Sequence, residues 1–154
     1  MLKQPATPIT AFGAQTSSLV RDLIDTMRAH LHCVGLAAPQ IGVSLRACVI
    51  DVSSHAKAQT SYGEVVLLNP EIVESREFVM AREGCMSVPD LTGDVPRAGL
   101  IAVRFHTLLG EVRTLEVRGF EARAFQHEID HLDGLLFLDR ADSHHGIFRR
   151  KAYR

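Results

Sequence analysis

The sequence has 154 residues, 46% of them hydrophobic, and a formal net charge of −1 at pH 7. These values fit a single domain over residues 1–154, and the near-neutral charge excludes a general attraction to DNA or to membrane surfaces. No apolar run is long enough to span a bilayer, and three cysteines are too few for a disulfide framework. We therefore expect a reducing, cytoplasmic compartment.

The first half of the chain is expected to form one helix followed by strands. Apolar residues recur at helical spacing up to about His32 and predict an amphipathic helix there. Thr16, Ser17 or Ser18 can cap its N-terminus. The apolar runs 47–52 and 65–69 are typical of buried strands. Pro70 is expected to end the second run, since proline donates no backbone hydrogen bond.

Further strands are expected in the second half. An extended stretch is expected around 77–80. Segments 99–105 and 111–118 alternate between apolar and polar residues, and a turn at 108–110 separates them. This pattern predicts an antiparallel hairpin.

A helix over 119–133 carries the most informative pattern of the chain. His127 and His131 are four residues apart and so share one helix face, where two neutral imidazoles can chelate a metal ion. Glu128 can reach a water bound to that ion without ligating it, an arrangement typical of hydrolases that attack a carbonyl group. The alternative is that the two histidines lie on a solvated polar face of the helix and bind no metal. Residues 135–138 predict a buried strand or an apolar plug.

The order of elements predicts an α+β fold. In it, antiparallel strands pack around the central metal-binding helix with the His-Glu-x-x-His pattern, and another helix lies near the N-terminus.

Cys85 is the candidate for a third metal ligand. A thiolate is a soft donor that binds zinc or ferrous iron alongside two imidazoles and leaves a fourth position open for water. Gly84 permits an unusual backbone conformation or a close approach just before the sulfur. The alternative for Cys85 is a small buried apolar residue.

Three motifs together resemble those of the peptide deformylase family. They are GLAAPQ at 35–40, EGCMS at 83–87 and QHEIDH at 126–131, and the resemblance extends over residues 2–139. It implies removal of the formyl group from the N-terminal formyl-methionine of nascent polypeptides.

The resemblance also implies a role for each matching residue. The metal ligands would be Cys85, His127 and His131. Glu128 would transfer protons, while the Gln40 amide and the backbone N–H of Met86 would bind the developing oxyanion. Residues expected to contact the substrate are Val34, Gly35, Glu83, Gly84, Phe120, Arg123 and Ala124. One divalent metal ion is implied, with Fe²⁺ as first choice and Zn²⁺, Ni²⁺ or Co²⁺ as alternatives.

Several positions depart from the family's usual pattern or need their own interpretation. Cys33 stands where many members have glycine, and its thiol either narrows the pocket or faces away. Thr92 lies near a position where many bacterial members have an arginine that meets the peptide. Arg123 either reaches over the pocket mouth or is solvated. Arg97 is expected to orient a carboxylate such as Glu83 or Asp130.

The basic tail over 140–154 suggests a second partner besides formyl-methionyl peptides. Arg149, Arg150, Lys151 and Arg154 could contact ribosomal RNA, and a solvated, disordered terminus is the alternative. The expected compartment is one with bacterial-type or organellar formyl-methionine translation. Two other functions remain open: a zinc peptidase of different specificity, and a deformylase-like protein with altered substrate or with binding activity only.

Overall fold

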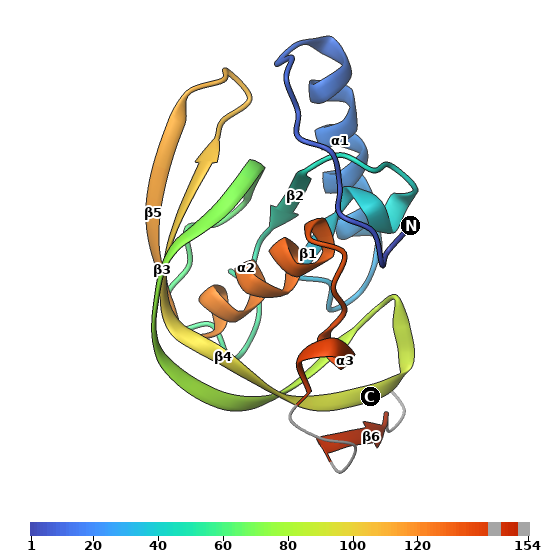
Figure 1. Cartoon of the computed structure of the whole chain (residues 1–154), viewed down its shortest axis with the longest axis vertical. Helices are drawn as coiled ribbons and strands as arrows, with labels where there is room; N and C mark the ends of the chain where they lie inside the picture. Colours follow the sequence, from blue (N-terminus) through green and yellow to red (C-terminus); the bar gives the residue numbers. More distant parts are fainter. Residues whose placement is uncertain (142–145, 151–154) are drawn as a thin grey trace.

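A computed structural model of the protein describes residues 1–141 and 146–150, and Figure 1 shows its arrangement. An antiparallel sheet accompanied by helices confirms the expected α+β class. The elements are α1 (Ala14–Ala29), β1 (Gly35–Ala37), the 3-10 helix η1 (Ala38–Ile41), β2 (Ala47–Ile50), β3 (Val65–Cys85), β4 (Val88–His106), β5 (Val112–Arg118), α2 (Gly119–Leu132), α3 (Phe137–Arg140) and β6 (Ile147–Arg149).

Helix α1 begins earlier than the sequence indicates. Its N-cap is Gly13, which makes no side-chain cap hydrogen bond, so the cap expected within residues 16–18 is wrong. Thr16 is instead buried in the first turn, and its hydroxyl donates to the carbonyl oxygen of Ala11 at 2.7 Å. The apolar face of α1, including Leu23 and Met27, packs against the β1–β2 end of the sheet.

The sheet has the strand order β1-β2-β3-β4-β5, with β6 added beside β4, and every neighbouring pair is antiparallel. The expectation that Pro70 ends a strand is wrong, because β3 continues through it. The pairing register shifts between Leu68 and Glu71, so the proline occupies an irregular position that needs no ladder donor. Asn69 adopts a positive φ of 51° there, and its side-chain amide exchanges two hydrogen bonds with the backbone of Ile9.

The expected hairpin is confirmed, since β5 pairs with β4 from Leu100 opposite Arg118 to His106 opposite Val112. Strand β4 begins much earlier than expected, at Val88, and pairs with β3 over most of its length. These two long strands bend around α2, which lies centrally in Figure 1 against β1, β2, β4 and β5. Phe125, Ile129 and Leu132 anchor α2 in the main core.

The run 135–138 does not form a strand. Leu136 is the N-cap of the short helix α3, and its N–H donates to the Asp139 carboxylate at 2.8 Å, which favours a helical turn over an extended chain. Phe137 is buried and packs against Cys85 and Val95. Of the two alternatives expected for this run, the apolar plug is therefore confirmed and the strand is wrong. No helix within the described residues is long and apolar enough to cross a membrane.

Candidate metal centre and its pocket

The hairpin end of β3 and β4 brings Cys85 to helix α2. A two-residue turn, Met86 and Ser87, joins the strands, and the register shifts between Gly84 and Cys85. The thiol sulfur of Cys85 lies 3.3 Å from Nε2 of His131. Ligand atoms of Cys85, His127 and His131 all lie within 4.8 Å of one another, so the structure brings the three expected ligands together.

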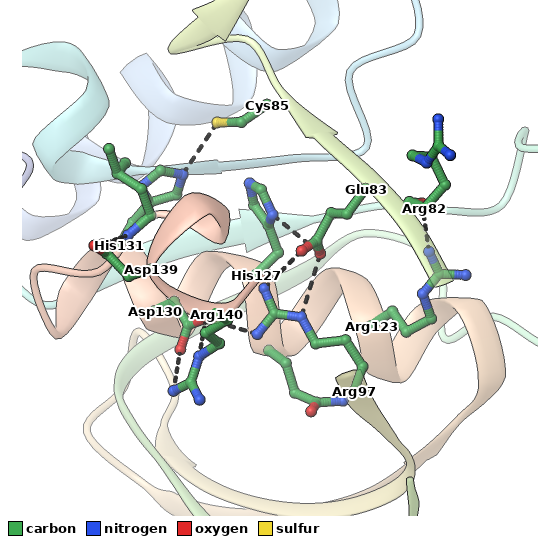
Figure 2. A network of polar contacts seen from close by, with 12 residues as sticks. Arg82, Glu83, Cys85, Arg97, Arg123, His127, Asp130, His131, Asp139 and Arg140 are labelled. Carbon is green, nitrogen blue, oxygen red and sulfur yellow. Dashed lines mark hydrogen bonds and ion pairs between the residues drawn. The ribbon is translucent and has the colours of Figure 1, made fainter. Parts of the chain in front are cut away.

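A chain of buried charges orients His127. Figure 2 shows Glu83 between the His127 ring and the guanidinium of Arg97. Nδ1 of His127 lies 3.2 Å from Oε1 of Glu83, which leaves Nε2 available to a metal ion. Arg97 donates to Glu83 at 2.8 Å and to Asp130 at 2.6 Å. Arg97 therefore orients both carboxylates that the sequence suggested as partners.

The Cys85 sulfur also receives polar contacts from two neighbouring segments. The backbone N–H of Ser87 lies 3.4 Å from it, and Nε2 of Gln40 lies 3.8 Å from it. The same Gln40 nitrogen donates to the Ser87 hydroxyl at 3.1 Å, while its Oε1 accepts the N–H of Ala37 at 2.9 Å. The amide is therefore held with its N–H₂ directed at the hairpin turn.

The two histidines differ in their affinity for protons. Burial, reinforced by the charge of His127, lowers the pKa of His131 to about 3. Burial also opposes protonation of His127, but its hydrogen bonds to Cys85 and Glu83 outweigh this effect and raise its pKa. Burial alone would raise the pKa of Glu83, yet His127 and Arg97 lower this pKa to about 2. Glu83 is thus a carboxylate that holds the His127 ring.

Glu128 lies beside the ligands and is buried. Burial raises the pKa of Glu128 to about 7, which suits a group that accepts and returns protons near neutral pH. Among the described residues, Oε2 of Glu128 has no hydrogen-bond partner. Gly35 packs directly on this side chain: a Cβ at Gly35 would lie 2.8 Å from Oε1.

These observations fit a metal ion. One sulfur and two imidazoles converge, and the Glu83 carboxylate fixes the tautomer of the His127 imidazole. The Oε2 atom of Glu128, which has no partner among the described residues, can accept a hydrogen bond from a water molecule at the centre. A solvated polar helix face is inconsistent with this burial, since His131 is 1% exposed.

A pocket opens onto the centre, and the residues expected to contact the substrate all line it. They are Val34, Gly35, Glu83, Gly84, Phe120, Arg123 and Ala124, together with Gln40, Met86 and Glu128. Cys33 also lines this pocket, and its thiol donates to the carbonyl oxygen of Gly35 at 3.2 Å. Arg123 lines the wall and donates to the carbonyl oxygen of Arg82 at 2.9 Å.

Sequence reasoning missed four residues of the pocket wall: His32, His55, Arg82 and Arg150. The ring of His55 stacks on Phe120 with 4.3 Å between ring centroids. No local motif marks any of the four, and the last three reach the pocket through long-range packing. Of the basic tail, Lys151 and Arg154 lie outside the described residues, whereas residues 147–149 form β6 and not a disordered end.

Comparison with known proteins identifies the family. A family model described as polypeptide deformylase matches residues 1–146. The chain belongs to the peptide deformylase family. A peptide deformylase of Heliobacterium modesticaldum is 42% identical over 93% of this chain and 89% of the relative.

Solved peptide deformylases share the fold. The crystal structure of peptide deformylase from Thermotoga maritima has a TM-score of 0.83 at 38% identity and covers 92% of this chain and 91% of that one. A Met-Ala-Ser-bound class I type b peptide deformylase from Acinetobacter baumannii has a TM-score of 0.83 at 37% identity, with 90% and 92% coverage.

Proposed function

We propose that the protein hydrolyses the formyl amide of N-terminal formyl-methionine in nascent polypeptides and releases formate. The observation that carries this function is the convergence of Cys85, His127 and His131 beside the buried Glu128, at a pocket formed by family motifs. Peptide deformylase relatives over nearly the whole chain support it.

In this function, Cys85, His127 and His131 hold one divalent metal ion. A metal ion bound there lowers the pKa of a ligated water towards about 7 and polarises the formyl oxygen. A thiolate and two imidazoles suit Fe²⁺, Zn²⁺, Ni²⁺ and Co²⁺. Fe²⁺ is our first choice among these four ions.

Glu128 is the proton-transfer group. It accepts a proton from the attacking water and delivers it to the departing amine, since an amide anion is too basic to leave. Its pKa of about 7 lets it serve in both directions.

Gln40 and the backbone N–H of Met86 stabilise the negative charge that develops on the formyl oxygen. The Gln40 amide is preorganised for this role by its bond to Ala37, which keeps its N–H₂ end towards Cys85. The walls of the pocket contact the methionine and the peptide that follows it, and they are formed by Val34, Gly35, Gly84, Phe120 and Ala124.

The test begins with anaerobic purification and metal analysis. Formate release from formyl-Met-Ala-Ser is then compared with cleavage of an internal bond in an unformylated peptide. Stoichiometric metal and formate release support the proposal. Internal cleavage without deformylation would favour a zinc peptidase, and binding without turnover would favour a binding-only protein.

We also propose one catalytic domain over residues 1–154, a cytoplasmic location in a bacterial-type system, and contact of the basic tail with the ribosome. Similar peptide deformylases occur in the bacteria Heliobacterium modesticaldum and Bacillus subtilis, which supports this location. Salt-sensitive co-sedimentation with ribosomes, lost on truncation after Ser143, would support the tail contact.

A further inference from the structure

A hydrogen bond between Gln40 and Ser87 joins two segments that are far apart in the sequence. Gln40 lies in η1, whereas Ser87 lies in the two-residue turn between β3 and β4. Nε2 of Gln40 donates to the hydroxyl oxygen of Ser87 at 3.1 Å, and the bond is partly buried. Because Met86 is the other residue of this turn, the bond attaches the turn and Met86 to η1.

The Gln40 amide is held at both of its ends. Its Oε1 accepts the backbone N–H of Ala37 at 2.9 Å, and its Nε2 donates to Ser87. A flipped amide would place its N–H₂ group against the N–H of Ala37, so that two donors would face each other. Ala37 therefore determines which end of the amide points to the turn, and Ser87 holds that end in position.

The second N–H of Gln40 is the one that a substrate oxygen can use. An amide nitrogen carries two hydrogens, and the Ser87 hydroxyl accepts one of them. The same nitrogen makes only a long contact, of 3.8 Å, with the Cys85 sulfur. Its second hydrogen is thus directed to the candidate metal centre without being held there by a short bond.

Ser87 also stabilises the turn that carries the other proposed oxyanion donor. The backbone N–H of Ser87 lies 3.4 Å from the Cys85 sulfur, and Ser87 directly follows Met86. The bond to Gln40 therefore links the side-chain donor of Gln40 to the backbone donor of Met86. Two donors that serve one oxygen are most effective when their positions are preset, because they need no reorganisation in the transition state.

We propose that Ser87 is a positioning residue, whose hydroxyl sets the geometry of the oxyanion site by anchoring the Gln40 amide to the hairpin turn. This inference rests on the proposed deformylase function and adds a residue to it. Gln40 and Met86 line the pocket, and Ser87 lies behind them, outside the lining. The hydroxyl of Ser87 acts through Gln40 and not by contact with the substrate.

Kinetics of the loaded enzyme on formyl-Met-Ala-Ser test this role. Ser87→Ala should lower kcat by about tenfold with little change in KM, since the Gln40 donor is misplaced but still present. Metal content should stay full, because the backbone N–H beside Cys85 is retained. Ser87→Thr, which restores a hydroxyl, should recover kcat to within about threefold of wild type. Ser53→Ala is the matched control, as the Ser53 hydroxyl donates to Asp51 at 2.6 Å and lies outside the pocket lining.

A double-mutant cycle determines whether Ser87 acts through Gln40. Gln40→Ala alone should lower kcat by about 10²–10³-fold, the usual cost of one oxyanion donor. Ser87→Ala added to this variant should cost nothing more, because the hydroxyl then has no amide to hold. The proposal is wrong if Ser87→Ala leaves kcat unchanged, or if it lowers kcat equally with and without Gln40.

A measurement without turnover separates this inference from the proposed function. In the zinc-loaded protein, ¹H–¹⁵N spectra identify the side-chain N–H₂ signals of Gln40 by their absence from Gln40→Ala. Their order parameter should be about 0.85 in the wild type and in Ser87→Thr, and should fall below about 0.6 in Ser87→Ala. Equal order parameters in all three proteins would refute the anchoring role. If the order parameter falls in Ser87→Ala but no protein releases formate, the anchoring role stands and the deformylase function alone is overturned.

Discussion

Nη1 of Arg97 lies 2.6 Å from Oδ2 of Asp130, and the two side chains are only 3% and 6% exposed. Asp130 stands on α2 between the two candidate histidine ligands, while Arg97 stands on β4. Because the same guanidinium also binds Glu83, it ties the ligand helix to the sheet and to the residue that holds His127.

Arg97→Leu should therefore destabilise the fold by about 3–5 kcal/mol, since it removes the cation that two buried carboxylates share and leaves Glu83 with His127 and Asp130 with the half-exposed Arg140. Urea unfolding of the loaded protein measures this loss. Arg104→Leu is the control, because Arg104 forms an exposed pair with Glu71, and such pairs contribute about 0–1 kcal/mol. Equal losses in the two variants would contradict the role of Arg97.

Cys85→Ala should lose the metal ion and all hydrolysis, because two imidazoles alone make a weaker site than the full set of three ligands. Metal content after gel filtration gives the readout. Cys33→Ser, which changes a pocket-lining cysteine outside the ligand group, should retain full occupancy. A Cys85→Ala protein with normal metal content would rule out the ligand assignment.

Glu128→Gln should keep the metal but lower kcat by about 10²–10⁴-fold, the usual contribution of general acid–base catalysis. Metal analysis and formate release are measured on the same sample. Near-wild-type turnover would show that another group transfers the proton.

Gly35→Ala tests the position of that carboxylate without removing it. The new Cβ would lie 2.8 Å from Oε1 and 2.9 Å from Cγ of Glu128, so the side chain must move. We expect kcat to fall by about 10- to 100-fold with metal retained, as small misplacements of a catalytic group cost that much. Gly13→Ala meets no atom within 4 Å and should leave kcat unchanged. If both variants turn over equally, the packing of Gly35 on Glu128 has no catalytic importance.

Cys33 should be slow to alkylate at pH 8. Burial raises the pKa of Cys33 from 9.0 to about 11, and the nearby Glu128 charge adds to this effect. A raised thiol pKa means less thiolate below it, so reaction with iodoacetamide should be about 100-fold slower than for an ordinary thiol. Mass spectrometry identifies the alkylation at Cys33. The rate of this reaction should still rise about tenfold per pH unit between pH 8 and 9.5. In the urea-unfolded chain it should instead level off near pH 9, and a similar plateau in the folded protein would refute the shift.

Features encoded in short segments could be predicted from the sequence. The periodicity of α2 and the spacing of His127 and His131 are local, and so is the alternation of the β4–β5 hairpin. Pro70 was misjudged because a tertiary contact, Asn69 with Ile9, stabilises the irregular strand around it. Residues 135–138 were ambiguous because apolar content does not separate a strand from a buried helical turn.

The remaining parts of the site depend on chain segments that meet only in three dimensions. Arg150 reaches Gly84 through pairing of β6 with β4, and His55 reaches Phe120 from a loop. Neither contact has a sequence signature, since each side chain alone is typical of an exposed position.

The candidate ligands come from two separate elements, with Cys85 on the β3–β4 hairpin and both histidines on α2. A metal ion bound by all three would act as a crosslink between sheet and helix. Ligand binding to the folded state alone adds about 4 kcal/mol of stability when the free ligand is at 1,000 times its Kd. Oxidation of Cys85 would then remove the crosslink as well as the activity. An inactivated molecule would thus unfold and be degraded sooner, which couples loss of catalysis to removal of the damaged protein.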